Sequence, residues 1–505
     1  MGEKYIKWDF TGRCNLRCAH CSVGKVYFEK DREPIRELTA QERLQVVDKL
    51  AAGGVGAVTF LGGEPLLLKD ELFDVAARCA AHGIAMSLVT NGLLLREEAV
   101  HKVIDSGIGT LVVSVDGASA KTHELIRGKG TYERVIANLD GMVRTIRREG
   151  APVKVRVNTV LNRQNAHEIR QMLDMWIEKD VDEWGALALG GVGYAEDHIE
   201  NLYLAPEEEI ELAVEFAKCW NARSSATRLD VFAQFIYPVI ADYIEEKYGL
   251  EVPRPMLCCN AATSLGFIRP DGTMYACDRV PNDRYTGKDI DGAAIRPMSL
   301  VDHDFYEIWN SDYFRAMFPF ILRADTYQNY DPCRRCKYLH DRSCNPCPLY
   351  SLDSNVVVHT CKLIEEWTGG FGQGAGTDKQ PGLLDTIETI RVEPTAPSEA
   401  QQRDSDRVPT PRQGIRSYAE GDQLVLLNPY DVTFIAVNPV GRMLWESMDG
   451  HRCIGDFAKD LEDVAEGVAA RIGARETPAD LEKYLMPQVQ GFFTSLAERG
   501  LIEWA

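Results

Sequence analysis

The cysteines constrain this chain most, because they are clustered rather than scattered. Fourteen cysteines in 505 residues are far fewer than a small disulfide scaffold needs. Two dense groups far apart in the chain indicate metal binding. Three cysteines lie near the amino terminus (Cys14, Cys18, Cys21), eight lie between Cys258 and Cys361, and the other three stand alone and are predicted to be small buried residues (Cys79, Cys219, Cys453).

The composition is that of an ordinary globular chain. Apolar residues make up 45% of it and charged residues 26%, which excludes intrinsic disorder for most of the length. At roughly 150 residues per domain, the length suggests about three domains. The formal charge of −20, from 56 basic and 76 acidic residues, disfavours nucleic acid as a general partner, because phosphate attracts basic surfaces.

No segment is suited to a membrane. The opening MGEKYIKWDF has neither a long apolar stretch nor a cleavage site, and no later run is long enough to cross a bilayer. We therefore expect a cytoplasmic protein without a membrane partner. A reducing compartment favours thiolate ligands for metals over disulfides.

Between residues 5 and about 250, short apolar runs alternate with helical patterns that mostly stop at Gly. The runs are continuous, as expected of strands buried on both faces. This alternation predicts an α/β fold whose parallel βα units close toward a full or partial barrel, with chemistry at the carboxyl ends of the strands. The strand candidates lie at 5–11, 57–61, 85–90, 110–115, 153–161 and 184–189.

The remainder of the chain divides by composition. Residues 251–367 are irregular and rich in cysteine, so we expect metals rather than a large core to hold them together. Residues 368–413 are rich in Gly, Pro, Ser and charge and are predicted to be a mostly flexible linker. Residues 414–505 are predicted to form a small independent domain, with strands at 423–429 and 433–439 and a long final helix. Residues 1–250 form the predicted barrel domain.

The motif C-N-L-R-C-A-H-C places Cys14, Cys18 and Cys21 in a loop just after the first strand candidate. A 4Fe-4S cluster normally takes four thiolates. Three thiolates in so tight a loop would leave one iron open to a substrate or cofactor, like the open position of a catalytic zinc site. A zinc site and unpaired core thiols are the alternatives for this spacing.

A second motif ends the strand candidate at 57–61. In Leu61-Gly62-Gly63-Glu64-Pro65 the two glycines allow the backbone to approach a ligand closely, and the carboxylate can meet an ammonium group. Alone, the motif could be a plain strand-ending turn. Downstream of the three-cysteine loop, it resembles the radical S-adenosylmethionine (SAM) superfamily, whose cluster loop has this spacing and whose second strand ends in GGE or GGEP.

The resemblance implies a partial (βα)6 barrel in which SAM chelates the open iron of a 4Fe-4S cluster. An electron from the cluster then cleaves the sulfonium and releases a 5′-deoxyadenosyl radical, which abstracts hydrogen from the substrate. Asn91 and Asp116 could instead cap turns. The implied cofactor-binding residues are Gly62, Gly63 and Glu64 at the methionine amino group, Pro65 completing that motif, Asn91, Ser114 and Asp116 facing the site, Arg127 at the cofactor carboxylate, and His20 beside the adenine.

The second cysteine group contains eight thiols, enough by count for two four-thiolate sites. Its paired C-x-x-C motifs could instead form a zinc ribbon. The order of the cysteines resembles the SPASM extension of radical SAM enzymes, which implies two auxiliary 4Fe-4S clusters. One cluster would take Cys277, Cys347 and one or both of Cys258 and Cys259, and the other would take Cys333, Cys336, Cys344 and Cys361.

This group departs from the SPASM pattern in two places. The gap from Cys336 to Cys344 is longer than in that pattern, and the gap from Cys344 to Cys347 is shorter. Cys258 and Cys259 are adjacent, and we do not expect both to reach one cluster. An open iron in the first auxiliary cluster, able to bind substrate, is therefore a hypothesis.

The last ninety or so residues (about 415–505), most specifically NPVGRMLWESMDG, are similar to the PqqD-like domain. That similarity implies a small winged-helix fold that recognises ribosomally made peptides by adding the leader of the peptide as a strand to a sheet edge. A winged helix could alternatively bind DNA. Residues 414–505 carry eight Lys and Arg against fifteen Asp and Glu, which is the wrong sign for phosphate, so peptide binding is favoured.

Together these features predict a radical SAM/SPASM peptide maturase that captures a precursor peptide through its carboxyl-terminal domain. The resemblance implies SAM, three 4Fe-4S clusters and a reducing partner such as flavodoxin or ferredoxin. The product would be a crosslink, a thioether or an oxidatively modified residue. Two alternatives remain open: a maturase of a protein or cofactor precursor, of the quinone cofactor or sulfatase type, and a non-catalytic metal-binding peptide scaffold.

Overall fold

Parallel strand pairing organises the first two-thirds of the chain. The chain divides into two compact units, Glu3–Gln380 and Pro381–Ala505, the second grouped with Met1–Gly2. The computed structural model describes residues 4–29, 35–223, 228–254, 260–279, 296–311, 313–314, 333, 336–340, 344, 356–368, 388–390, 407–412, 415–420, 423–428, 433–461 and 481–504.

The first unit is built on a nine-stranded sheet in the order β7-β6-β5-β4-β3-β2-β1-β8-β9. Every neighbouring pair from β7 to β8 is parallel, and only β9 runs antiparallel to its neighbour β8. The strands are β1 (Lys4–Thr11), β2 (Val55–Gly62), β3 (Ala85–Thr90), β4 (Thr110–Ser114), β5 (Lys154–Leu161), β6 (Glu183–Ala188), β7 (Asp230–Ala233), β8 (Leu265–Ile268) and β9 (Met274–Tyr275).

The six predicted strands correspond to β1–β6, which confirms the α/β fold class with a parallel sheet. Strand β7 was not predicted. It has only four residues, DVFA, and the apolar positions around it run on into the next helix, so its own period is too short to recognise.

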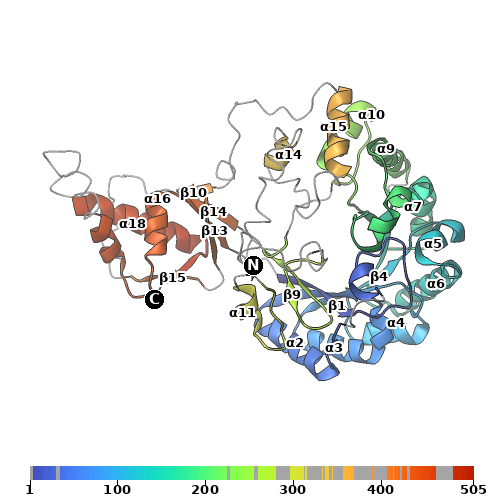
Figure 1. The fold of residues 1–505 in the computed structure, drawn as a ribbon, viewed down its shortest axis with the longest axis horizontal. Helices are drawn as coiled ribbons and strands as arrows, with labels where there is room; N and C mark the ends of the chain where they lie inside the picture. The colour runs from blue at the N-terminus through green and yellow to red at the C-terminus, as the bar shows by residue number, and fades with distance from the viewer. Residues whose placement is uncertain are drawn as a thin grey trace. The chain divides into compact units, whose positions relative to one another are not determined.

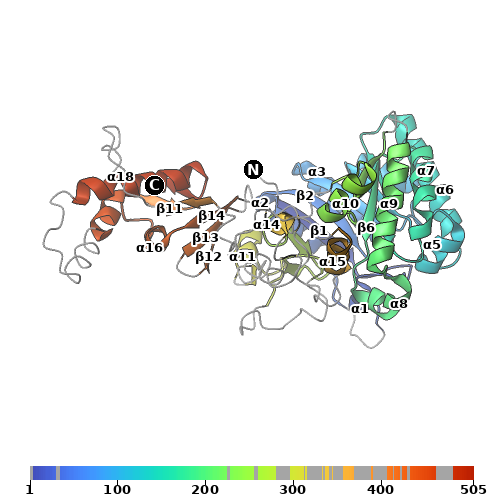
Figure 2. The same cartoon turned by 90° about the horizontal axis from the view of Figure 1, so that it is seen from above.

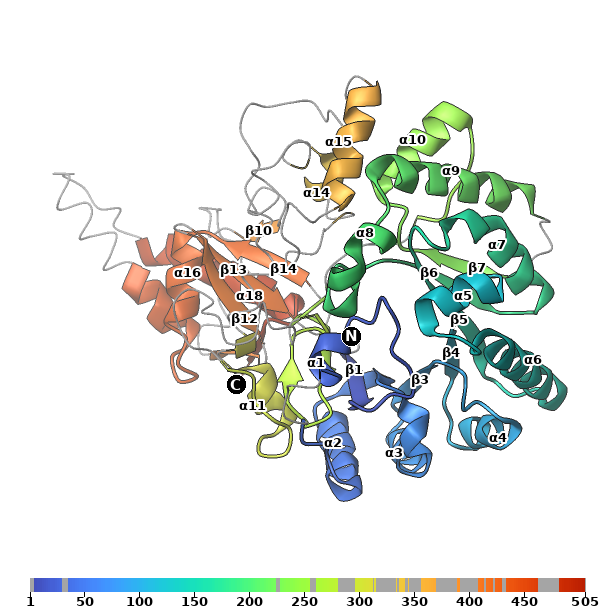
Figure 3. The ribbon, with the colours of Figure 1, turned by 45° about the vertical axis from the view of Figure 1, so that its right-hand side comes forward.

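Helices lie in an arc along the outside of the strands (Figure 3). Sequence signals mark several of their ends. Thr39 caps α2 in a capping box with Glu42, and α6 ends at Gly150, which has a left-handed φ of +60°. The helices of the arc are α2 (Ala40–Ala52), α3 (Lys69–Ala81), α4 (Glu97–Asp105), α5 (Ala120–Arg127), α6 (Tyr132–Glu149), α7 (Ile169–Glu178) and α9 (Pro206–Ala222).

The two faces of the barrel strands differ in chemistry. On β1, Ile6, Trp8 and Phe10 are fully buried in the hydrophobic core, whereas Tyr5, Lys7 and Asp9 line an internal cavity. The prediction that both faces of the strands are buried needs this correction: the face toward the cavity carries polar and charged side chains. Side chains alternate across a strand, so polar residues inside and apolar residues outside follow a period of two.

The predicted ranges 1–250 and 251–367 lie in one unit. Helix α15 (Val356–Thr368) packs against α9 and α10 (Pro238–Tyr248), and these three helices lie near one another in Figure 1. Buried Thr360 donates a 2.5 Å hydrogen bond to Glu209 of α9. Two shorter helices of this region are α11 (Phe305–Trp309) and α14 (Lys337–His340).

The second unit contains a four-stranded sheet in the order β10-β14-β13-β12. Figure 2 labels β12, β13 and β14 of this sheet. Strands β12 (Arg416–Glu420), β13 (Gln423–Asn428) and β14 (Thr433–Val437) are antiparallel, whereas β10 (Glu388–Ile390) adds to β14 in parallel. A separate pair joins β11 (Pro409–Pro411) to β15 (Ile502–Trp504). The helices include α16 (Pro439–Glu446) and α18 (Leu481–Glu498).

Strands β10 and β11 lie inside residues 368–413, the range predicted as a linker, and both pair with strands of the second unit. The buried core of this unit is apolar and includes Leu426, Ile435 and Phe493. The winged-helix arrangement of the unit stays a prediction. Among the described residues, no helix is both long and apolar enough to span a bilayer.

Candidate active site

The first unit encloses a cavity of about 810 Å³. All seven strands from β1 to β7 contribute lining residues, and so do the three cysteines of the first motif. Because parallel strands present their side chains inward in register, residues far apart in sequence meet here. The cavity is therefore the candidate active site.

The loop that carries Cys14, Cys18 and Cys21 is fastened to the barrel through its backbone. Ala19 donates an N–H hydrogen bond to the carbonyl of Ile126 (2.8 Å), and Tyr194 donates one to the carbonyl of Cys21 (3.0 Å). All three thiols are half-buried. Burial raises the pKa of each, and that of Cys21 rises to about 12, so the thiols are protonated near neutral pH without a metal.

The glycine pair of the second motif packs against this loop. A Cβ atom on Gly63 would lie 2.0 Å from the carbonyl oxygen of Arg13, and one on Gly62 would lie 2.8 Å from that of Thr11. The Gly63 and Glu64 amides donate hydrogen bonds of 2.8 Å to these same carbonyls. Gly62 also has a left-handed φ of +112°. The two glycines thus allow β2 to touch the backbone that leads into the cysteine loop.

Glu64 does not line the cavity. Its carboxylate is fully buried and accepts hydrogen bonds from the Thr90 hydroxyl (2.8 Å) and from the backbone amides of Asn91 (2.8 Å) and Leu66 (3.1 Å). Burial raises its pKa, and these three donors oppose that rise. Buried Pro65 follows as the first residue of the short helix η1 (Pro65–Leu68). These contacts fix the carboxylate within the protein, and its role beside the amino group of SAM stays a prediction.

Asp116 joins two of the predicted cofactor residues. Its Oδ2 atom accepts hydrogen bonds from His20 Nε2 (2.7 Å) and Arg127 Nε (2.5 Å), and its Oδ1 atom accepts one from the Val160 amide (2.8 Å). Asp116 is fully buried behind the cavity wall, whereas His20 and Arg127 line the cavity. Burial alone raises the pKa of Asp116, but Arg127 and His20 outweigh it and hold the pKa well below its ordinary value.

Asn91 and Ser114 both line the cavity at strand ends. Ser114 is the last residue of β4. The Asn91 amide group donates to Asn15 Oδ1 (2.7 Å), and its own Oδ1 atom accepts from the Leu93 amide (3.1 Å). Asn91 thus both caps a turn and ties the end of β3 to the cysteine loop.

Part of the second cysteine group is brought together in the first unit. Cys333, Cys336 and Cys344 are buried, as is Cys361 on α15. Burial raises the pKa of Cys361 well above its ordinary value, and Cys344, Cys333 and Cys336 raise it further, so the four thiols are electrostatic neighbours. These four are the predicted ligand set of one auxiliary cluster.

Of the ligands predicted for the other auxiliary cluster, the structure describes Cys277 alone. It is buried, two residues beyond β9. Cys258, Cys259 and Cys347 lie outside the described residues. The three isolated cysteines behave mostly as expected: Cys79 and Cys219 are buried on α3 and α9, whereas Cys453 is half-buried.

Sequence reasoning missed the charged side chains that line the cavity. Lys7 pairs with Asp278 (3.1 Å), and Glu183 accepts from Lys154 and Arg156 (2.8 Å each). Polar residues at every second position of YIKWDFT and VKVRVNTVL were the available signal, because a polar lumen requires a period of two. The lumen is therefore a charged and polar chamber.

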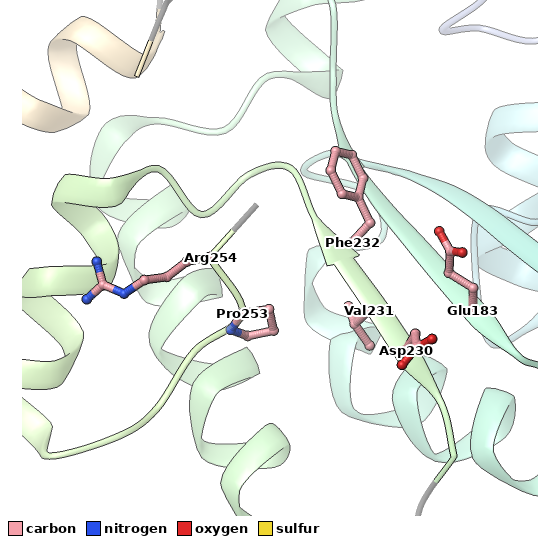
Figure 4. Close-up of a pocket in the computed structure, with 6 residues that line it drawn as sticks. All are labelled: Glu183, Asp230, Val231, Phe232, Pro253 and Arg254. Carbon is pink, nitrogen blue, oxygen red and sulfur yellow. The ribbon is translucent and has the colours of Figure 1, made fainter. Parts of the chain in front are cut away.

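Glu183 also lines a smaller pocket of about 180 Å³ at the amino ends of β6 and β7 (Figure 4). Asp230, Val231, Phe232, Pro253 and Arg254 complete its wall. The Arg254 guanidinium is held by Asp242 (2.9 Å) and Glu245 (2.5 Å). This pocket lies at the opposite ends of the strands from the cysteine loop.

The residues that line the cavity are chemically suited to a 4Fe-4S cluster and to SAM, the two groups that the resemblance implies. Thiols share a wall with a glycine-lined backbone and with Arg127, which supplies donors for iron and a cation for a ligand carboxylate. Within the described segments, no three Cys, His, Asp or Glu side chains already surround a common point. The cavity residues therefore fit a cluster and SAM by the chemistry of their donor groups and by lining the same cavity.

Comparisons with known proteins agree with this chemistry. The profile of the Radical SAM superfamily matches residues 8–175, that of an iron-sulfur cluster-binding domain (SPASM) matches 258–337, and that of coenzyme PQQ synthesis protein D (PqqD) matches 423–502. AdoMet-dependent heme synthase of Methanosarcina barkeri is 33% identical over 344 residues, 66% of this chain and 88% of that protein. The chain belongs to the radical SAM superfamily.

Further relatives agree with this assignment. Mycofactocin maturase MftC of Mycolicibacterium smegmatis is 26% identical over 331 residues, 62% of this chain and 71% of that protein. The crystal structure of Streptococcus suis SuiB bound to precursor peptide SuiA has a TM-score of 0.51 at 16% identity, covering 70% of this chain and 76% of that one, which shows a shared fold. The protein is thus a radical SAM enzyme with iron-sulfur and PqqD domains, and the non-catalytic scaffold is not favoured.

Proposed function

We propose that this radical SAM enzyme modifies a ribosomally made precursor peptide. The observation that carries the proposal is the pairing of β10 with β14 in the PqqD-containing unit. Residues 388–390 lie outside the range matched by the PqqD profile, yet they add to the edge of its sheet. An edge that accepts a strand from outside the domain is suited to an extended peptide.

The leader of the precursor would bind this edge in the place of β10. In the sheet order, β14 has β13 on one side and β10 on the other, whereas β12 forms the opposite edge. Backbone hydrogen bonds from β14 would supply affinity for leaders of varied sequence, because strand addition depends little on side chains. The core segment of the peptide would then reach the cavity of the first unit.

In the cavity, we assign the SAM-binding 4Fe-4S cluster to Cys14, Cys18 and Cys21. Once bound, the cluster and SAM supply a 5′-deoxyadenosyl radical that abstracts a hydrogen atom from the substrate. The chain's own residues orient the cofactor. Asp116 holds Arg127 and His20 at the cavity wall, and buried Glu64 holds the turn that presents Asn91.

We assign one auxiliary 4Fe-4S cluster to Cys333, Cys336, Cys344 and Cys361, and the other to Cys277, Cys347 and one or both of Cys258 and Cys259. All four thiols of the first set are buried, and Cys344, Cys333 and Cys336 raise the pKa of Cys361, which supports that set. Three clusters and an external reductant such as flavodoxin or ferredoxin are then required. The product class is a crosslink, a thioether or an oxidative modification.

Binding and turnover of a neighbouring peptide test this function. A short open reading frame beside the gene, with a Cys-rich or aromatic-rich tail, would supply the precursor. The full chain should bind its leader and, once loaded with iron and sulfide anaerobically and given dithionite and SAM, should change the mass of the core. A chain that forms 5′-deoxyadenosine but neither binds nor alters the peptide would refute the proposal.

A second candidate is action on a tetrapyrrole, because relatives in the same comparison are named heme synthase and pre-heme d1 synthase. The cationic side chains that line the cavity, among them Lys7, Lys154 and Arg156, could meet tetrapyrrole carboxylates. Incubation of the loaded enzyme with an iron-coproporphyrin separates the two: its conversion, with no change in the peptide, would favour this candidate. Maturation of a quinone cofactor or sulfatase precursor is tested by supplying those proteins instead.

A further inference from the structure

Gln234 is a polar residue of the cavity wall that the site described above does not use. It directly follows β7, and its backbone amide donates a 2.8 Å hydrogen bond to the carbonyl of Ala186 on β6. Phe232 and Gln234 line the cavity, whereas Ala233 between them is fully buried in the core. Gln234 itself is only half-buried. Its side chain is therefore accessible to a molecule inside the cavity.

Three amide side chains of the described residues line the cavity, and Gln234 is the one without a partner. Asn91 donates a hydrogen bond to Asn15 (2.7 Å). Asn158 accepts one from Arg156 Nε (2.9 Å). The Gln234 side chain makes no hydrogen bond with any residue of the described segments. Both its carbonyl oxygen and its NH₂ group thus remain for a ligand.

Ion pairs already hold three cations of the cavity wall. Lys7 lies 3.1 Å from Asp278, and Lys154 and Arg156 each lie 2.8 Å from Glu183. A carboxylate of a ligand would have to compete with these acids for the cations, whereas a neutral polar group would not. The paired charges therefore favour a neutral ligand group in this part of the cavity.

The neighbours of Gln234 in the wall are apolar. Ala186 of β6 pairs with Ala233 of β7, so Leu187 and Gln234 are the next residues of the two strands, and Leu187 and Phe232 both line the cavity. A ligand that fills this space displaces water from the Gln234 amide. An amide stripped of water is costly unless its donor and its acceptor are both satisfied.

A second amide satisfies both groups at once, because it offers one carbonyl acceptor and at least one N–H donor. An ionised carboxylate only accepts hydrogen bonds. The carboxylates of a coproporphyrin would leave the Gln234 carbonyl without a donor, whereas a peptide carries amides along its whole backbone. The chemistry of this side chain therefore fits a peptide better than a tetrapyrrole.

We propose that Gln234 is a specificity-determining residue that binds an amide in the core segment of the precursor peptide. The inference rests on the proposed function, in which that segment enters the cavity. Gln234 Nε2 donates to the carbonyl oxygen of the amide, and Gln234 Oε1 accepts from its N–H. The amide is that of a peptide bond or of an Asn or Gln side chain in the core.

Binding of the core without turnover tests the contact. The full chain, loaded with iron and sulfide and kept without reductant, is titrated calorimetrically with the leaderless core of the precursor. Gln234→Leu removes both hydrogen-bonding groups and should weaken binding by about 10-fold. Gln171→Leu is the matched control, because Gln171 is exposed on α7, and it should bind the core like the wild type. Unchanged affinity in a folded Gln234→Leu chain would overturn the assignment.

Two further measurements keep the test informative. If Gln234→Leu does not fold, Gln234→Glu takes its place, because it keeps the accepting oxygen, loses the donor and should also bind the core more weakly. During turnover with SAM and reductant, the substituted enzyme should show a KM for the core raised by about 10-fold. A KM equal to that of the wild type would count against the contact.

Altered peptides identify the amide. Cores methylated at one peptide nitrogen at a time each lose one N–H, and cores with Leu in place of an Asn or Gln lose that side-chain amide. The peptide that lacks the bound amide should bind the wild type about 10-fold more weakly. It should lose no further affinity on Gln234→Leu, because the two changes remove the same contact. Additive losses for every such peptide would refute the proposal.

The outcomes separate this inference from the proposed function. If the wild-type chain neither binds nor alters the peptide, the proposed function fails and the role of Gln234 fails with it. If the wild type binds and modifies the peptide while Gln234→Leu binds the core equally well, only the assignment of Gln234 is wrong.

Discussion

Arg127 donates a 2.5 Å hydrogen bond through Nε to the fully buried carboxylate of Asp116. The same oxygen accepts from His20, so one acid behind the cavity wall positions two side chains that line it. Asp116 follows β4 and Arg127 ends α5. The pair therefore joins a strand end, a helix end and the cysteine loop.

Asp116→Asn should destabilise the chain and weaken SAM binding. The substitution leaves Arg127 buried without its anion, and breaking one partner of a buried pair costs about 3 kcal/mol. Because the pKa of Asp116 is held low, its contribution is complete above the ordinary Asp pKa and is lost as the pH falls through the lowered value. Urea unfolding at neutral pH and SAM affinity of the loaded enzyme measure both effects. A surface control, Asp48→Asn, should give a much smaller change, and equal changes would contradict the prediction.

Gly63→Ala should displace the cysteine loop. The new Cβ atom would lie 2.0 Å from the Arg13 carbonyl oxygen, so one of the two backbone segments must move. Loss of iron on anaerobic loading and of 5′-deoxyadenosine formation would report this. Gly141→Ala makes the same substitution on α6, where the nearest atom is 4.0 Å away and Ala favours the helix by about 1 kcal/mol. That variant should keep its iron, and similar losses in both would count against the packing explanation.

Asp9→Asn should change how stability depends on pH. The folded-state pKa of Asp9 is raised by burial from 3.8 to about 7, so the native chain holds a proton that the unfolded chain releases. The contribution of Asp9 to stability therefore falls as the pH rises through this window, by about 3 kcal/mol between about pH 5 and about pH 8. The variant lacks this fall. Chemical denaturation of both cluster-free chains across this pH range measures the difference in their stability. Glu209, whose pKa is also about 7, contributes equally to both chains. Curves of stability against pH that run parallel for the two chains would therefore exclude the prediction.

Cys361→Ser should remove one auxiliary cluster. Cys361 is buried on α15, and Cys344, Cys333 and Cys336 act on its pKa, so a 4Fe-4S cluster held by these four thiols would lose a ligand. Iron analysis after anaerobic loading should fall by about four atoms per chain. The control Cys453→Ser alters a half-buried cysteine of the second unit, and its iron content should stay at the wild-type value. Unchanged iron in Cys361→Ser would mean that another group completes the site.

Thr389→Pro should strengthen binding of a precursor leader. Thr389 lies opposite Ala436 of β14 in the parallel pairing, and proline removes a backbone donor and disfavours the strand. If β10 competes with the leader for this edge, freeing the edge raises the apparent affinity several-fold. Fluorescence titration of a labelled leader on the full chain measures it, with Thr389→Val as a control that preserves the strand. Weaker binding to Thr389→Pro would indicate that β10 assists the leader instead.

Several elements could be read from the sequence for direct physical reasons. The apolar runs at β1–β6 and the helical patterns between them reproduce the strand and helix periods, and the fold class followed from their alternation. Strand β7 was not predicted, because its four residues are too few to define a period. The polar interior of the barrel was not predicted, because the inward-facing positions of β1 and β5 were not separated from their apolar neighbours.

The sequence predicted which residues belong to the site but not the contacts that those residues make with one another. Cys14, Cys18, Cys21, Gly62 and Gly63 were predicted from their motifs to belong to one site, and all five line the same cavity. The packing of Gly63 against Arg13 was not predicted, because it depends on a loop that follows another strand. The motifs did not predict that Glu64 and Asp116 hold other residues in position, since the direction of a buried carboxylate depends on donors distant in sequence.

The sequence by itself determined the family, the strand and helix order and the clustering of thiols, because periodicity and motif spacing are local properties of the chain. Only the tertiary structure decided which side chains share the cavity, which carboxylates are neutralised and which edge of the second sheet is covered. Those outcomes depend on contacts between distant segments, where burial and charge act across strands. The cysteines are examples: their spacing indicated metal binding, whereas the fold brought Cys333, Cys336 and Cys344 near enough to Cys361 to raise its pKa.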